Sequence, residues 1–259
     1  MENVKIPENW AVYIGDIDDK PAVFRVNLGL AEVLPLEGYP EAVRVSIQLK
    51  KPDENGFYDE EEREIAYAID DAIAAVVEAQ GAILAGVVTY QGKVAWHCYA
   101  ANGKALEEAV KAVEGQYPDY PLAVKIAANE AWVVYFDYLY PNIYEMQAIQ
   151  NDKVRDHARE VGDQVEVPRP IEHYLYFETD KDTQRAADKM RELGYEIIDA
   201  GKVEPDEEDD PNADLGYRIL ASKVGTPVAI NVDTWDLVDV ALDNNGEYDG
   251  WETIIVKSV

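Results

Sequence analysis

Apolar and polar residues alternate through much of the first fifty positions, a period of two that is typical of β-strands with one buried face. Turn signals interrupt the alternation at Asp18-Asp19 and at Gly38-Tyr39-Pro40. The pattern therefore predicts three strands that open the chain, at Trp10–Ile14, Val23–Leu28 and Val43–Leu49.

The spacing then changes to a helical period. The acidic residues 59–62 lead a segment whose apolar residues recur every three or four positions and which ends at Gly81. A second helix is predicted at Lys104–Glu114. The remaining predicted strands of this half are Ile83–Tyr90 and Lys93–Tyr99, joined by a tight turn at Gln91-Gly92, and a final pair at Leu122–Ala128 and Trp132–Tyr138.

The second half begins with an amphipathic helix predicted at Ile143–Val161, with Gly162 as its C-cap, and a connection at Asp163–Pro170. The elements predicted after it are a strand at Ile171–Phe177, a helix from Thr179 or Asp180 to Leu193, strands at Tyr195–Asp199 and Tyr217–Val224, a helix at Asn231–Asn244 and a strand at Trp251–Val256. This β-α-β-β-α-β order is that of a ferredoxin-like domain.

The length of 259 residues and the apolar content of 47% are enough for two domains of ordinary size. The predicted fold class is α+β, because strands outnumber helices and the helices fall between them. We expect two α/β-sandwich domains, at residues 1–150 and 151–259, of which the C-terminal one is ferredoxin-like.

The formal net charge is −29, from 52 acidic and 23 basic residues, and neither half of the chain is basic. Phosphate contacts are made largely by Lys and Arg, so the charge argues against direct nucleic-acid binding. Such acidity serves either solubility or attraction to a basic protein surface. The densest run, Glu204–Pro211, is interpreted as a solvated loop, as a docking element for a basic partner or as a weak divalent-cation site.

The sequence gives no sign of export or membrane insertion. Cys98 is the only cysteine, the first residues lack the apolar core of a signal peptide, and no apolar run reaches the length of a membrane span. We expect a cytoplasmic protein.

Sequence motifs for catalysis, cofactors and metals are absent. We find no nucleophile-elbow sequence, no Walker or dinucleotide-binding loop and no paired zinc ligands. The spacing of Asp243, Asn245 and Glu247 starts like a calcium loop, but Tyr248 and Ile254 occupy the positions that need Gly and a bidentate Glu. Neighbouring residues on a strand face opposite ways, so His97 and Cys98 form no dyad, and Cys98 is expected in the core. We therefore expect no catalytic residue, metal ligand or cofactor.

His173 is the one histidine in a suggestive place. On a strand it shares its face with the apolar Ile171, Leu175 and Phe177, while Glu172 faces the other way. This pattern favours a buried histidine. A ligand or proton-transfer role is the alternative, with Glu247, Asp249 or Glu252 nearby if the first and last strands of the domain are neighbours.

The closing motif allows two interpretations. Gly246 and Gly250 bracket Tyr248, Asp249 and Trp251, which form either a structural corner of the fold or an exposed aromatic and acidic recognition patch. The candidate binding residues are accordingly Glu172, His173, Glu247, Tyr248, Asp249 and Trp251.

Three motifs occur in order in the C-terminal half: Ile-Glu-His at 171–173, Leu-Gly-Tyr-Glu-Ile at 193–197 and Glu-Tyr-Asp-Gly-Trp at 247–251. With them, residues 154–259 resemble the regulator of ribonuclease activity B family. Founding members of that family bind ribonuclease E and inhibit its cleavage of RNA, so the resemblance implies a ribonuclease as protein partner. Those members carry an acidic tail beyond the closing motif, whereas the acidic run of this sequence is internal.

Residues 1–150 resemble a bacterial family of unknown function that is often joined ahead of such a domain. The resemblance rests on the segment Trp132–Pro141 and on the Asn55-Gly56 turn before an acidic helix. It implies no activity.

The leading hypothesis is a non-enzymatic regulatory protein that docks on a basic protein surface, such as that of a ribonuclease. One alternative is a hydrolase or metal-dependent enzyme that uses His173 with nearby carboxylates. Another is a small-ligand module in which Tyr and Trp residues of the N-terminal domain, among them Trp10, Trp96 and Trp132, line a pocket.

Overall fold

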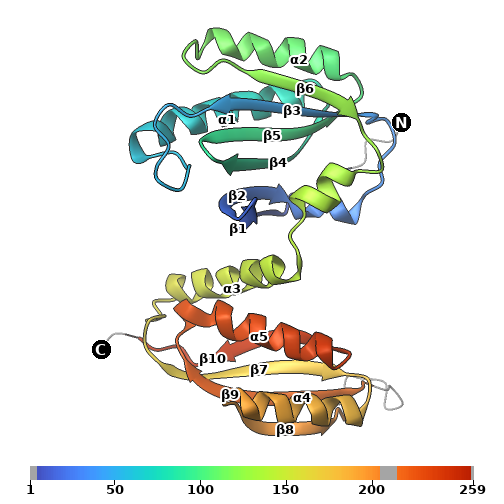
Figure 1. Cartoon of the computed structure of the whole chain (residues 1–259), viewed down its shortest axis with the longest axis vertical. Helices are drawn as coiled ribbons and strands as arrows, with labels where there is room; N and C mark the ends of the chain where they lie inside the picture. Colours follow the sequence, from blue (N-terminus) through green and yellow to red (C-terminus); the bar gives the residue numbers. More distant parts are fainter. Residues whose placement is uncertain (1–4, 205–214, 258–259) are drawn as a thin grey trace. The chain divides into compact units, whose positions relative to one another are not determined.

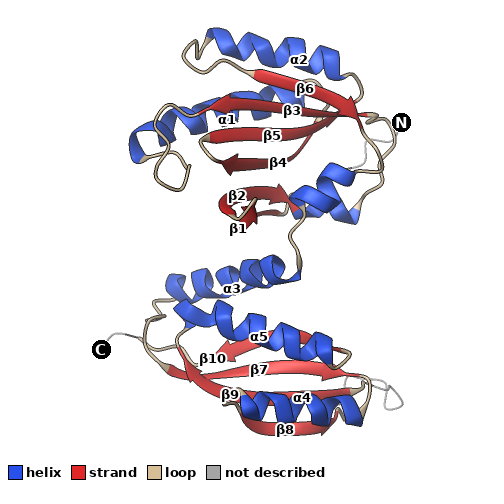
Figure 2. Ribbon diagram, in the orientation of Figure 1, coloured by secondary structure: helices blue, strands red, loops and turns tan. Residues whose placement is uncertain are grey.

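The structure, a computed structural model, describes residues 5–204 and 215–257. The chain divides into two compact units, Met1–Glu145 and Met146–Val259, shown in Figure 1. Each unit contains one antiparallel sheet and its own helices (Figure 2). The predicted α+β class with two domains is therefore confirmed. The acidic run Glu204–Pro211 lies, apart from its first residue, outside the described residues.

The sheet of the N-terminal unit has the strand order β1-β2-β4-β5-β3-β6. Its strands are β1 (Trp10–Ile17), β2 (Lys20–Asn27), β3 (Glu41–Gln48), β4 (Ile83–Tyr90), β5 (Lys93–Ala100) and β6 (Ala123–Ala128). Two of the connections, Asp18-Asp19 and Gln91-Gly92, have positive φ at both residues. This backbone matches the twist of a two-residue hairpin. The predicted hairpin at Gln91-Gly92 is confirmed.

Two helices cover one face of this sheet: α1 (Glu60–Ala79) and α2 (Gly103–Lys111), the latter continued by a 3-10 turn, η2 (Ala112–Gly115). Asp59 caps α1, because its carboxylate accepts a hydrogen bond from the Glu62 N–H at 2.8 Å. The apolar face of each helix packs on the sheet around the fully buried Trp96. Cys98 lies in this core, as the sequence predicts.

The opposite face of the sheet is covered by a short π-helical turn, η3 (Val134–Leu139). The sequence predicts a strand here, at Trp132–Tyr138, and that prediction is wrong. The segment is rich in β-branched and aromatic residues, which favour strands. Its two fully buried side chains, Tyr135 and Leu139, are four positions apart, which is the spacing of one helical face. Burial of that face on the sheet therefore overrides the local propensity.

The C-terminal unit contains residues 146–160 of α3 (Ile143–Glu160) and then the predicted β-α-β-β-α-β order. Its further elements are β7 (Arg169–Phe177), α4 (Asp180–Glu192), β8 (Glu196–Lys202), β9 (Tyr217–Gly225), a 3-10 turn η4 (Pro227–Ala229), α5 (Ile230–Asp243) and β10 (Gly246–Thr253). The strand order β10-β7-β9-β8 is that of a ferredoxin-like sheet, and α4 and α5 pack on one face of it (Figure 1). The ferredoxin-like prediction is confirmed.

The last strand lies earlier in the chain than the predicted Trp251–Val256. The ladder with β7 ends where Thr253 pairs with Ile171, because the next residue of β7 is Pro170, which has no N–H to donate. Beyond it, the Val256 carbonyl accepts a backbone hydrogen bond from the connection that leads from α3 to β7: Gln164 N–H donates to it at 2.8 Å.

A buried ion pair fixes the same connection. Asp163 and Arg169 contact each other with side chains that are almost fully buried, and Asp163 also accepts the Val256 N–H at 2.8 Å. Arg169 donates in addition to the Gln164 carbonyl at 3.1 Å. Each ion thus has a further hydrogen bond, as a buried pair needs, although Arg169 Nε is buried without a hydrogen-bond partner in the described part of the chain.

Tyr135→Phe tests the role of η3. The Tyr135 hydroxyl donates to the Asn27 carbonyl at 2.9 Å and accepts the Ala31 N–H at 3.1 Å. We expect the variant to lose about 1–3 kcal/mol of unfolding free energy, because two backbone groups lose a buried partner. The measurement is the shift of the urea midpoint at an unchanged slope. Tyr138→Phe is the control, since Tyr138 is 40% exposed. An equal shift in both variants would contradict the prediction.

Candidate functional site

A β-bulge determines how the closing motif is presented. In the ladder between β10 and β7, Tyr248 pairs with Leu175 and Gly250 pairs with Tyr174, so Asp249 is the extra residue. Tyr248 and Trp251 are three positions apart, and regular alternation would point them to opposite faces. With the bulge, both stand opposite residues of β7 that face the helices. The strand therefore directs two aromatic rings to one side and its carboxylates to the other.

Asn151 of α3 connects three elements of this unit. It is fully buried, and its amide nitrogen donates to Asn231 and Thr234 of α5, at 3.0 and 2.8 Å. Its amide oxygen accepts from the Trp251 indole N–H at 2.9 Å and from Gln147 at 3.0 Å. Every hydrogen-bonding position of the amide is thus used, and the Trp251 ring is held against α3.

His173 is a core residue. It is 1% exposed, it shares a hydrogen bond of 3.0 Å with the Tyr248 hydroxyl through Nδ1, and its ring contacts the Tyr195 ring edge-on. Burial lowers the pKa of His173 to about 4, so the ring is neutral at pH 7. The pKa of Tyr248 is raised by the same burial. These two residues form a satisfied polar pair inside the sheet–helix core.

The opposite face of the sheet carries the carboxylates of the motif. Glu247 stands opposite Tyr176, and Glu252 stands opposite Glu172. Tyr174 donates to Glu252 at 2.6 Å, and this hydrogen bond raises the pKa of Tyr174 to about 12. In the described part of the chain, Glu172, Glu247, Asp249 and Glu252 form no ion pair with a basic residue. This acidic–tyrosine face, residues 172, 174, 176, 247, 249 and 252, is exposed or half-buried throughout.

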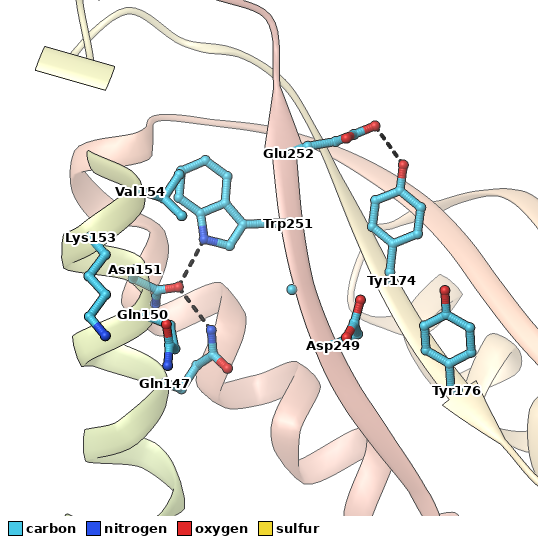
Figure 3. Close-up of a pocket in the computed structure, with 11 residues that line it drawn as sticks. Gln147, Gln150, Asn151, Lys153, Val154, Tyr174, Tyr176, Asp249, Trp251 and Glu252 are labelled. Atoms are coloured by element: carbon cyan, nitrogen blue, oxygen red, sulfur yellow. Dashed lines mark hydrogen bonds between the residues drawn. The ribbon is translucent and has the colours of Figure 1, made fainter. Parts of the chain in front are cut away.

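A groove of about 500 Å³ runs along β10, which is an edge strand of the sheet. Figure 3 shows Trp251 and the amides of α3 on one side of β10, and Asp249, Glu252 and the two tyrosines on the other. The groove is lined by Gln147, Gln150, Asn151, Lys153, Val154, Tyr174, Tyr176, Asp249, Gly250, Trp251 and Glu252. Amides, tyrosines and carboxylates in an open groove beside a strand edge suit recognition of a polypeptide, because the strand adds backbone groups to the side-chain contacts.

The structure separates the six candidate residues into two sets. Glu172, Glu247 and Asp249 lie at the acidic–tyrosine face, whereas His173 and Tyr248 are buried and Trp251 is half-buried against α3. The first and last strands are neighbours, as the sequence analysis required, but the carboxylates do not reach His173. In the described residues, no group of three or more His, Cys, Asp or Glu side chains could hold a metal ion.

Sequence reasoning missed the lining residues that α3 supplies, Gln147 and Asn151 above all. A helix between domains gave no reason to expect a buried amide, and only the contacts with α5 and β10 reveal it. Tyr174 and Tyr176 alternate with the buried residues of β7 and so share the face of Glu172, but the sequence analysis did not include them in the candidate site.

The alternative based on tryptophan rings in the N-terminal unit finds little support. Trp96 and Trp132 are buried, so a ligand cannot stack on them. Trp10 is 40% exposed, and Arg25 lies over its ring at 5.4 Å. Among the helices that the structure describes, none is both long and apolar enough to cross a membrane.

These features define a two-domain α+β protein whose second domain is ferredoxin-like, with an acidic and aromatic edge. Comparison of the chain with protein families gives two matches. Residues 8–140, just over half of the chain, match the family of unknown function DUF695, and the chain belongs to that family. Residues 148–253 match the family described as regulator of ribonuclease activity B. Both resemblances inferred from the motifs are thereby confirmed.

Other comparisons add little. A search of curated proteins found no match. Two solved structures are similar over 83% of this chain: an unknown protein from Galdieria sulphuraria, at 10% identity, 99% coverage of that chain and a TM-score of 0.24, and a "putative glycine cleavage system transcriptional repressor", at 8%, 98% and 0.23. At TM-scores this low, neither similarity supports a conclusion about this protein.

Asn151→Leu tests the connection between α3, α5 and β10. The variant leaves the Trp251 indole N–H and the Thr234 hydroxyl without their partner in the core. We expect a loss of roughly 2–4 kcal/mol of unfolding free energy and a red-shifted tryptophan emission as the Trp251 ring is released. The control is Gln150→Leu, at the exposed neighbouring position. If both variants shift the urea midpoint equally, the network does not hold the helix.

The lowered pKa of His173 predicts a loss of stability in acid. The folded value is about 4 and the ordinary value is 6.5. Below pH 6.5 the unfolded chain gains a proton that the folded chain cannot accept, so stability is full above that pH and falls until about pH 4. Between pH 7.5 and 5 this amounts to about 2 kcal/mol for His173.

Urea unfolding of the wild type and of His173→Gln at pH 7.5 and at pH 5 measures the contribution of His173 to this loss of unfolding free energy. The variant should lose less stability than the wild type as the pH falls. His97 of the N-terminal unit has a lowered pKa as well and acts in the same direction, so the informative quantity is the difference between the two proteins. Parallel pH profiles would contradict the prediction.

Proposed function

We propose that this chain is a cytoplasmic, non-enzymatic regulator of a ribonuclease, and that its C-terminal domain binds the ribonuclease through the acidic–tyrosine face. The observation that carries the proposal is the match of residues 148–253 to the regulator of ribonuclease activity B family. The inferred partner is an enzyme of the ribonuclease E type, as the motif resemblance implies.

The negative charge of the acidic–tyrosine face supports docking on a basic surface of the partner. Glu172, Glu247, Asp249 and Glu252 present four carboxylates without ion-pair partners in the described residues, and the whole chain carries a net charge of −29. A ribonuclease must present positive charge to its RNA. Carboxylates are therefore steered toward the same kind of surface, and a bound acidic domain competes with the substrate.

The aromatic residues and the strand edge supply short-range contacts. Tyr174 and Tyr176 lie between the carboxylates, and tyrosine combines a large apolar ring with a hydroxyl, which suits protein interfaces. The groove beside β10 can accept an extended segment of the partner along the strand. Charge accordingly sets the rate of encounter, and the tyrosines and the edge set the lifetime of the complex.

The test is a titration of the full chain into purified ribonuclease E, with binding followed by biolayer interferometry and cleavage followed on a fluorescent RNA. We expect binding that slows cleavage and whose association rate falls as salt rises from about 0.05 M to about 0.5 M, because charges more than a few ångströms apart are then screened. No binding at low salt, or binding without effect on cleavage, would refute the proposed regulation.

Glu247→Lys combined with Glu252→Lys localises the interface. The double variant should bind about tenfold or more weakly at low salt, since repulsion replaces attraction at the centre of the face. The matched control is Glu160→Lys combined with Glu192→Lys, which changes the net charge equally at exposed helix positions. If the control weakens binding as much as the test variant, only net charge matters and the assigned face is wrong.

A further inference from the structure

Three basic side chains stand in one row on a sheet face of the N-terminal unit. His97 of β5 is directly opposite Arg44 of β3, and Arg44 is directly opposite Lys125 of β6. Directly opposed residues of antiparallel strands project to the same face, here the face that η3 covers. Like charges in this position destabilise a sheet. The pair Arg44 and Lys125 therefore carries a cost that the fold alone does not explain.

The row has no acidic partner. Within the described ranges, neither Arg44 nor Lys125 makes an ion pair or a side-chain hydrogen bond, although the chain has 52 acidic residues and 23 basic ones. Carboxylates are abundant in this protein and yet none is placed here. Arg44 is half-buried and Lys125 is exposed, so both positive charges are available to an anion from solution.

A pocket of about 330 Å³ lies over the row. Its lining is Ala42, Val43, Arg44, His97, Cys98, Tyr99, Lys125, Ala127, Val134 and Tyr138, so the walls around the basic groups are largely apolar. Val134 and Tyr138 come from η3, the segment that replaces the predicted strand. A volume near 300 Å³ is at the lower end of the range for small-molecule sites.

His97 supplies an independent observation. It is 6% exposed, and its Nε2 is buried without a hydrogen-bond partner. A buried polar atom of this kind costs free energy until a partner arrives. Burial, and to a lesser extent Arg44, lower the pKa of His97 to about 4, so the ring is neutral at pH 7 and offers one hydrogen bond without adding a third positive charge.

These groups specify the chemistry of a ligand. A guanidinium and an ammonium bind the oxygens of carboxylates and phosphates, and a neutral imidazole can donate to the same oxygens. The apolar walls disfavour a fully hydrated inorganic ion and accept a hydrocarbon part. We propose that this pocket binds a small organic anion, with its carboxylate or phosphate group between Arg44 and Lys125, within reach of His97 Nε2, and its apolar part against Val134 and Tyr138.

The proposal is independent of ribonuclease regulation, because it concerns the N-terminal unit and an anionic ligand. The proposed partner of the acidic–tyrosine face is, by contrast, a basic protein surface. The net charge of −29 repels anions in general, so binding of an anion requires a local site. The ligand would neutralise the row from outside the chain, and the unit should become more stable when it binds.

Isothermal titration calorimetry of the full chain with four probes tests the pocket. Benzoate and phenyl phosphate carry the proposed groups, benzamide is the neutral counterpart of benzoate, and inorganic phosphate lacks the apolar part. We expect benzoate or phenyl phosphate to bind at least about tenfold more tightly than benzamide and inorganic phosphate. Which of the two binds better identifies the head group.

Two results would overturn the proposal at this stage. One is the absence of binding by both organic anions up to about 10 mM, the weakest affinity that a fragment of this size should show. The other is that the organic anion which binds more tightly has no higher affinity than its counterpart, benzamide for benzoate or inorganic phosphate for phenyl phosphate, because its charge or its apolar part would then not be recognised.

Lys125→Gln locates the site, and Lys93→Gln is its matched control on β5, exposed and outside the lining. Lys125→Gln should weaken anion binding about tenfold, the loss expected for one charge-assisted hydrogen bond. Without ligand, the same variant should unfold at an equal or higher urea concentration than the wild type, because the repulsion with Arg44 is relieved. The control should leave the affinity unchanged.

His97→Gln gives a second readout from inside the pocket, with weaker anion binding expected because Nε2 is lost. Since this side chain is buried, Lys125→Gln decides the matter if His97→Gln does not fold. Equal affinities of Lys125→Gln and the wild type for the organic anions would refute the assignment, as would a loss of binding that Lys93→Gln shares.

Discussion

The C-terminal domain depends on the buried amide of Asn151. A single side chain on α3 accepts from the indole of β10 and donates to two residues of α5, so helix, helix and edge strand are held by one group. Buried amides are costly unless every position is satisfied, and here all of them are. The groove along β10 exists because this amide holds α3 beside the strand.

The bulge at Asp249 is the second constraint. It places the core residues of the closing motif on one face of the sheet and the residues proposed to bind a partner on the other. Tyr248 and Trp251 turn inward, to His173 and to Asn151, while the carboxylates and the tyrosines of β7 remain at the surface. Five consecutive residues thus stabilise the core and also present an acidic edge. Recognition of a partner and stability of the domain are coupled in this strand, so variants of the motif must be chosen by the face on which each residue lies.

The N-terminal unit uses its sheet differently, since elements pack on both faces. Helices α1 and α2 bury the apolar face around Trp96, and η3 covers the other around Tyr135 and Leu139. Covering a face that also carries His97 and Arg44 creates a pocket with polar groups at its base. The family matched by residues 8–140 is one of unknown function. The row of His97, Arg44 and Lys125 is the feature of this unit that supports the proposed anion site.

Local pattern determined much of this protein. Periodicity placed most strands and helices, the order of elements identified the ferredoxin-like domain, alternation placed His173 in the core, and three short motifs indicated the family of the second half. Local pattern failed where long-range contacts decide. The segment Trp132–Tyr138 has strand propensity but becomes helical because Tyr135 and Leu139 are buried on a sheet face.

The composition of the candidate sites also depends on long-range contacts, which local pattern does not determine. A bulge shifts the register by one residue, which no propensity encodes, and it moved Trp251 to the helix side. The amide of Asn151, the row of His97, Arg44 and Lys125, and both pockets join residues that are far apart in the chain. Sequence fixes which groups are available and how each segment tends to fold, but only the pairing of strands determines which groups meet.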